Sequence, residues 1–122
     1  MVRTTMAVFL AAALILWSVA WGEAVPKEQA IRIAVGAAEN EFTFNPSRVS
    51  ASAGVPVQLT VVNKGKIQHD FHVEALRVTL HLIDPGRSGS MRFTPTKKGT
   101  FEFRCAVPGH YEAGMKGTIT VK

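Results

Sequence analysis

The chain has 122 residues, 47% of them hydrophobic, which is enough for one small domain with its own core. Its net charge of +5 comes from charges scattered along the sequence rather than from a basic run, so nucleic acid is not expected as a partner. Its single cysteine excludes an internal disulfide.

The first 24 residues have the pattern of a secretory signal peptide. Arg3 precedes a largely apolar run from Met6 to Ala20, and small residues follow at Gly22 and Ala24. Cleavage after Ala20 and cleavage after Ala24 both fit. An uncleaved membrane anchor is the alternative, because the run falls just short of the roughly 17 to 25 residues that span a bilayer. We therefore expect an exported protein, periplasmic or otherwise extracytoplasmic, with residues 25–122 as its one folded domain.

Residues 25–122 contain short segments with the period of β-strands. These segments are rich in β-branched and aromatic residues, and turn signals such as Ala53-Gly54 and Asp84-Pro85-Gly86 separate them. The pattern predicts an all-β fold, an antiparallel Greek-key sandwich or barrel of about eight strands. The expected strands are Ala30–Ala37, Val49–Ala51, Val55–Asn63, His69–Ala75, Val78–Ile83, Ser90–Phe93, Thr100–Cys105 and Gly117–Val121.

The alternation of side chains along two expected strands, His69–Ala75 and Val78–Ile83, predicts which histidines are buried. His69 shares a face with the apolar side chain of Phe71, whereas His72 lies on the opposite face. A strand with one face on the core turns its apolar face inward, so we expect His69 to be buried and His72 to be solvated. The same test on the next strand places Leu82 inward and His81 outward.

The segment from Phe103 to Val121 combines three side chains that can bind a soft metal ion. Cys105 ends a strand whose aromatic residues face inward, His110 follows a turn, and Met115 precedes the last strand. An unpaired thiol outside the cytoplasm is prone to oxidation unless something occupies the sulfur. A strand-loop-strand unit can direct these three side chains to one point, where His69 can supply a fourth ligand. A thiolate, two imidazoles and a weak thioether are the ligands of a mononuclear blue-copper site.

Other interpretations of these residues are less consistent with the whole set. Taken singly, the histidine, the thiol and the thioether could each be an ordinary buried side chain. Zinc gains little from a thioether, calcium and magnesium need oxygen ligands, and iron–sulfur or dinuclear copper centres need more cysteines. We therefore expect one copper ion that alternates between Cu(I) and Cu(II).

The sequence resembles the cupredoxins, or small blue copper proteins, over most of residues 25–122. The Cys-x4-His-x4-Met spacing is similar to that of rusticyanin and sulfocyanin-type members. The resemblance implies that His69, Cys105 and His110 are equatorial ligands and that Met115 is the axial one. It rests on Phe42-Thr43-Phe44-Asn45-Pro46, Val62-Asn63-Lys64-Gly65, His69-Asp70-Phe71, Pro85-Gly86 and the segment from Gly99 to Gly117.

Such a site is expected to carry single electrons between redox partners and not to act as an enzyme. The partner is expected to be a redox protein, such as a cytochrome or a membrane oxidase or reductase, that docks near His110. We expect the protein to be a monomer. We expect it to be attached to a membrane only if residues 1–24 are retained. Asn63 and Asp70 are candidates for contacts around the ligands, with turn and surface roles as the alternative. The alternatives are a copper carrier or storage protein, an accessory copper subunit of a respiratory complex, and a copper enzyme. A β-sandwich without a metal, used for adhesion or as a subunit of a complex, is the remaining alternative.

Overall fold

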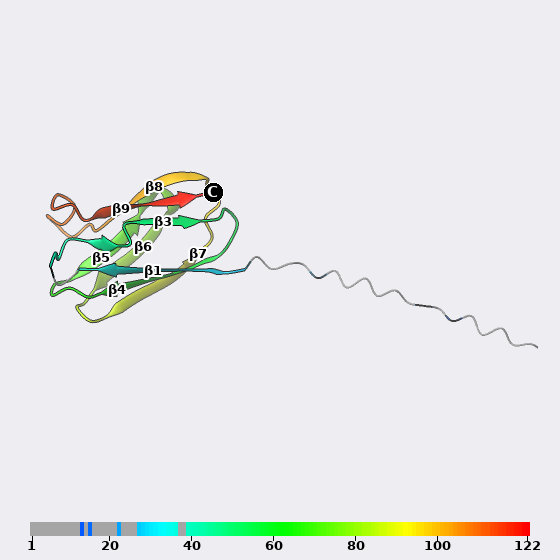
Figure 1. The fold of residues 1–122 in the computed structure, drawn as a ribbon, viewed down its shortest axis with the longest axis horizontal. Helices are drawn as coiled ribbons and strands as arrows, with labels where there is room; N and C mark the ends of the chain where they lie inside the picture. The colour runs from blue at the N-terminus through cyan, green and yellow to red at the C-terminus, as the bar shows by residue number, and fades with distance from the viewer. Residues whose placement is uncertain (1–12, 14, 16–21, 23–26, 37–38) are drawn as a thin grey trace, which may run out of the picture.

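A computed structural model describes residues 27–36 and 39–122, together with residues 13, 15 and 22. The described residues form two β-sheets that pack face to face (Figure 1). One sheet has the order β2-β1-β4-β7, from β1 (Gln29–Val35), β2 (Phe44–Asn45), β4 (Val57–Asn63) and β7 (Ser88–Phe93). The other has the order β3-β9-β8-β5-β6, from β3 (Arg48–Ala51), β5 (His69–Val73), β6 (Val78–Ile83), β8 (Gly99–Arg104) and β9 (Lys116–Val121). A 3-10 turn, η1 (Glu74–Leu76), joins β5 to β6.

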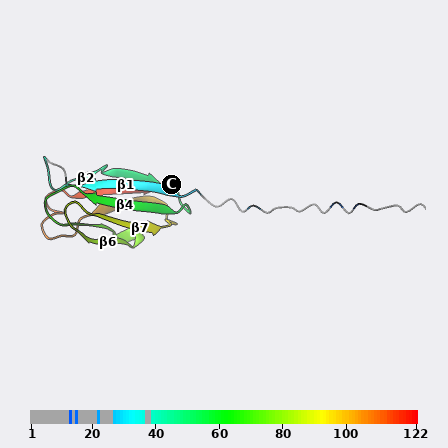
Figure 2. The same ribbon diagram turned by 90° about the horizontal axis from the view of Figure 1, so that it is seen from below.

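The all-β sandwich expected from the sequence is confirmed, but its sheets are mixed rather than antiparallel. β1 pairs with β4 in parallel and β3 pairs with β9 in parallel, whereas the other pairings are antiparallel. Figure 2 shows β2, β1, β4 and β7 in succession across one sheet. Alternation reports which side chains face the core, but it does not report the direction of the neighbouring strand. β2, with two residues, is too short to give a periodic signal.

The predicted leader, residues 1–24, lies outside the described residues except at positions 13, 15 and 22. Within the part of the chain that the structure describes, no helix combines the length and the apolar character needed to cross a bilayer. The export signal and its retained-anchor alternative both stay predictions.

Three phenylalanine rings form the part of the core that lies next to the expected site. Phe44 packs edge-on against Phe71 and Phe103, with ring centroids 5.7 and 5.1 Å apart, and Phe71 and Phe103 lie 5.0 Å from each other. Phe71 stands two residues after His69, and Phe103 stands two residues before Cys105. The two sheets are therefore packed firmly together just where they present these two side chains.

The structure confirms the predicted orientation of β5. His69 and Phe71 are completely or almost completely buried, His72 is partly exposed, and His81 on β6 is exposed. Asp70 differs from its neighbour on the same face, His72, because it is only 9% exposed. A carboxylate with so little access to water needs hydrogen-bond partners within the protein.

The alternation predicted for the end of β6 is wrong. Leu82, expected inward, is 57% exposed, whereas Ile83 is buried. His69 lies opposite Ile83 while Phe71 lies opposite Leu80, so β6 contains one extra residue at this point. Such a β-bulge reverses the alternation beyond it, and one sequence does not reveal where it falls.

Gly117 offers a test of the packing beside the aromatic core. A Cβ atom at this position would lie 2.3 Å from Phe103 Cζ and 2.3 Å from the Ser47 carbonyl oxygen. We predict that Gly117→Ala lowers the free energy of unfolding by about 1 to 3 kcal/mol, because overpacking displaces the ring and the backbone. Urea unfolding of the metal-free protein measures this, with the exposed Ser50→Ala as a control that changes stability by less than about 0.5 kcal/mol. Equal stabilities of the two variants would contradict the packing described here.

Candidate metal centre

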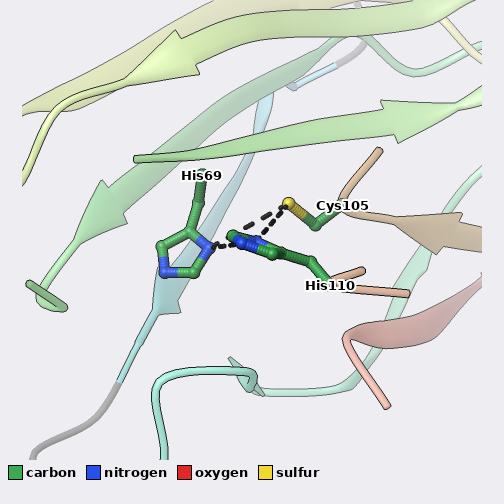
Figure 3. A group of neighbouring side chains, drawn as sticks. All are labelled: His69, Cys105 and His110. Carbon is green, nitrogen blue, oxygen red and sulfur yellow. Dashed lines mark hydrogen bonds between the residues drawn. The ribbon is translucent and has the colours of Figure 1, made fainter. Parts of the chain in front are cut away.

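His69, Cys105 and His110 meet at one end of the sandwich, although 36 residues separate the first two along the chain. Figure 3 shows the three side chains pointing toward one another from the start of β5, the end of β8 and the loop that follows. His69 Nδ1 lies 3.2 Å from His110 Nδ1, and Cys105 Sγ lies 3.4 Å from His110 Nδ1 and 4.0 Å from His69 Nδ1. All three residues are buried. Three of the four predicted ligands are thus brought together.

The three donor atoms are spaced as a single metal ion requires. For a triangle with sides of 3.2, 3.4 and 4.0 Å, the point equidistant from all corners lies about 2.1 Å from each. Metal–nitrogen bonds of about 2.0 to 2.1 Å and metal–sulfur bonds of about 2.3 Å are usual for an ion such as zinc. One soft sulfur and two imidazole nitrogens also suit copper. The residues present therefore fit a copper ion in size and in chemistry.

The loop between β8 and β9 is fixed by its own backbone hydrogen bonds. The Cys105 N–H donates to the Met115 carbonyl at 3.2 Å, and the Met115 N–H donates to the His110 carbonyl at 3.1 Å. Within the loop, the His110 N–H donates to the Val107 carbonyl at 3.0 Å. These backbone bonds fix the positions of Cys105, His110 and Met115 without a bound metal ion.

Met115, the predicted axial ligand, is completely buried at the end of this loop. Its backbone bonds to both Cys105 and His110, so its position is tied to theirs. The assignment of its thioether as a ligand stays a prediction from the sequence.

Burial shifts the pKa of two of the three side chains in the direction of the uncharged form. Burial raises the pKa of the Cys105 thiol, although the N–H groups of Asp70 and Val107 partly offset this. Burial and the neighbouring His69 lower the pKa of His110. A neutral imidazole keeps the lone pair that a metal ligand needs. The thiol, in contrast, must lose its proton to become a ligand.

Asp70 connects β5 to the cysteine segment. Its N–H lies 3.5 Å from Cys105 Sγ, and its carboxylate Oδ1 accepts the Ala106 N–H at 2.6 Å. Oδ2 lies 3.2 Å from Nε2 of His72, without the alignment of a hydrogen bond. Asp70 therefore does contact the predicted ligands, as proposed from the sequence.

Asn63 has a different role from the contact with the ligands that we considered. Its amide donates to the carbonyls of Ile67 and Ile83 at 2.8 Å each, and its Oδ1 accepts the Gly65 N–H at 2.9 Å. It therefore holds the turn that leads into His69 and does not itself reach the cluster.

The sequence analysis gave no role at the cluster to Glu41 or to Phe42, although Phe42 belongs to a segment that carries the family resemblance. Glu41 Oε1 lies 2.9 Å from His69 Nε2, and the Phe42 ring packs edge-on against His110 at 5.0 Å. Burial raises the pKa of Glu41, but hydrogen bonds from His69, Ile67 and Lys66 outweigh it, so the pKa is lowered. Glu41 precedes His69 by 28 residues, and no periodic pattern links the two positions.

Comparisons with known proteins identify the family to which this arrangement belongs. The model of the cupredoxin-like domain matches residues 7–121. A plastocyanin from Scenedesmus fuscus is 34% identical over 103 residues, which cover 75% of this chain and 99% of that protein. The copper-resistant cuproprotein CopI of Rubrivivax gelatinosus is 29% identical over 120 residues, covering 83% of this chain and 71% of CopI.

A solved structure of auracyanin B has the same fold. It superposes with a TM-score of 0.66 at 28% identity and covers 80% of this chain and 90% of that one. The similarity of the loop spacing to rusticyanin and sulfocyanin is not reflected in these matches and stays an interpretation.

The contact between Asp70 and Ala106 leads to a prediction about the cysteine segment. We expect Asp70→Ala to accelerate hydrogen exchange of the Ala106 amide about ten- to hundredfold in the metal-free protein, because hydrogen bonds to charged groups contribute about 1.5 to 3 kcal/mol. Asp70→Asn is the matched control, since its side-chain oxygen still accepts the bond. NMR exchange rates measure both variants, and an unchanged rate in Asp70→Ala would show that this bond does not hold the segment.

Proposed function

The chain belongs to the cupredoxin-like domain family, whose cofactor is copper, and we propose that it carries single electrons through one copper ion bound by His69, Cys105, His110 and Met115. The observation that carries the proposal is the convergence of two Nδ1 atoms and one Sγ around a common centre. When bound, copper supplies the one-electron couple between Cu(I) and Cu(II). The protein's part is to hold the ligands in place and to exclude water.

Rigid ligands suit this function because little has to move when one electron arrives or leaves. The backbone bonds of the loop and the Asp70 bond to Ala106 keep Cys105 in one place. The Asp70 N–H close to the sulfur is positioned to stabilise the thiolate and so to influence the potential. His110, 7% exposed, is the ligand with the greatest access to the surface and is the proposed route for electrons.

The surface near His110 is the proposed docking site for a redox protein, such as a cytochrome or a membrane oxidase or reductase. Tyr111 is the next residue, and two cations lie over its ring: Lys116 Nζ at 4.9 Å and the Arg104 guanidinium at 5.8 Å. A partner with an acidic surface fits this charge. We further propose a monomeric, exported protein, with residues 1–24 as the leader and residues 25–122 as the domain.

A second function, in copper handling or resistance, is favoured by the name of the CopI relative. A carrier or storage protein has to exchange its ion readily, whereas an electron carrier has to retain it through repeated reduction and oxidation. Slow loss of copper to a chelator together with reversible reduction supports the electron carrier. Within the described residues, His69, Cys105 and His110 form the one group of His, Cys, Asp and Glu side chains with metal-binding geometry.

Copper titration tests the proposal directly. We predict that Cu(II) gives the purified protein an intense visible absorption band, which reduction removes and reoxidation restores. Cys105→Ser is expected to lose at least nine-tenths of the intensity of this band, because the thiolate is its source. The variant is expected to be folded to about the same extent as the unmodified protein. His72→Ala is the matched control and keeps the band, since His72 points away from the cluster. An intense band in Cys105→Ser would refute the ligand assignment.

Two lysines that stack on aromatic rings test the docking surface. Lys116 lies over Tyr111, the residue after His110, whereas Lys97 lies 5.5 Å from the Phe101 ring. Lys97 precedes β8, and the first residue of that strand, Gly99, lies about 20 Å from Cys105 along the strand. We predict that Lys116→Gln slows reduction of the Cu(II) protein by hexacyanoferrate(II) roughly twofold or more at low ionic strength, and that Lys97→Gln does not. Stopped-flow absorbance measures the rates. The difference should vanish at 1 M salt, where the Debye length is about 3 Å; equal effects of the two variants would contradict docking at this end.

A further inference from the structure

Glu41 has a role toward the copper site that goes beyond its contact with one side chain. We propose that Glu41 is a positioning residue for His69 that strengthens the binding of Cu(II) over Cu(I) and thereby lowers the midpoint potential; this rests on the proposed function. One carboxylate oxygen of Glu41 receives three contacts at hydrogen-bond distance. They come from His69 Nε2 at 2.9 Å, the Lys66 N–H at 2.8 Å and the Ile67 N–H at 3.0 Å.

The contact with Glu41 determines which nitrogen of His69 carries the proton. An ionised carboxylate can only accept hydrogen bonds, so the neutral ring donates through Nε2–H. Nδ1 then keeps its lone pair, and it is Nδ1 that faces Cys105 and His110. A carboxylate behind a metal-binding imidazole fixes both its tautomer and the orientation of its ring, and it makes the imidazole a stronger donor.

The fold provides a close-fitting space for this carboxylate. A Cβ atom on Gly65 would lie 2.1 Å from Glu41 Oε1 and 2.7 Å from its carboxyl carbon. A Cβ atom on Gly36 would lie 2.6 Å from the Gly65 Cα, so the backbone of Gly65 can come this close only because position 36 is a glycine. Asn63 holds the Gly65 turn from the other side through its bond to the Gly65 N–H. The two glycines and the turn that Asn63 holds thus form a site for the Glu41 carboxylate. The Glu41 side chain is 20% exposed.

The negative charge of Glu41 separates its role from that of any neutral acceptor. A backbone carbonyl in the same place would also fix the tautomer of His69. A carboxylate in addition favours the more positive ion, because its charge lies only one imidazole ring away from the ligand atom. Removing the charge while keeping the hydrogen bond should therefore affect Cu(II) more than Cu(I).

Glu41→Gln and Gly65→Ala test this role by independent routes. The glutamine keeps the size of the side chain and an oxygen that accepts the three N–H groups, but it loses the charge. The alanine keeps the glutamate but occupies its space, and no positive φ makes alanine unfavourable at position 65. We expect both variants to bind Cu(II) about 10- to 100-fold more weakly in competition with a chelator. A loss tenfold greater for Cu(II) than for Cu(I) raises the midpoint potential by about 59 mV, which potentiometric titration of the visible band measures.

Glu28→Gln is the matched control, because it removes one exposed carboxylate that pairs with Arg92 near the start of β1. We expect this variant to have the affinity and potential of the unmodified protein. NMR of the diamagnetic Cu(I) protein gives a readout independent of potential: the His69 Nε2–H should exchange with solvent more slowly in the unmodified protein than in Gly65→Ala. Unchanged affinity and potential in Glu41→Gln, or equal shifts in Glu28→Gln, would overturn the role of Glu41. Absence of the band from the unmodified protein would instead overturn the proposed function.

Discussion

The buried meeting of one thiol and two imidazoles is the constraint on which the rest of the structure depends. Polar groups removed from water destabilise a fold unless they find partners, and here Cys105, His69 and His110 face one another within 4.0 Å. The rest of the fold has to hold segments from separate parts of the chain together in spite of the free-energy cost of burying these polar groups. The aromatic packing below the site and the bonded loop above it supply the necessary rigidity.

A layer of polar side chains holds each segment of the site through backbone groups. Asp70 binds the Ala106 N–H, and Asn63 fixes the turn before β5. Glu41 binds that same turn and then His69. Each residue hydrogen-bonds to backbone groups and also restricts a predicted ligand or the segment next to it, so the same bonds serve the stability of the fold and the proposed metal binding. These bonds hold His69 and Cys105 in place through the chain alone, as the proposed one-electron function requires.

The sequence analysis succeeded where a signal is local and failed where it depends on partners distant in the chain. The burial of His69 followed from alternation within β5, and the spacing of Cys105, His110 and Met115 lies within one loop. The bulge in β6 was missed, because an extra residue is recognised only against the paired strand. The parallel pairings and the contact of Glu41 with His69 depend on how distant segments assemble, and no alternation records that.

The way in which the ligands are enclosed favours an electron carrier over a protein that delivers copper. His69, Cys105 and His110 are all buried around the proposed site, and the last two belong to a loop whose ends are joined by the bond between Cys105 and Met115. Opening that loop would also separate Ala106 from Asp70 and expose the fully buried Met115. An electron, in contrast, needs no opening on the proposed route, because His110, although buried, is the predicted ligand with the greatest access to the surface. On the proposed function, this enclosure would slow the exchange of the ion without requiring any opening for the passage of electrons.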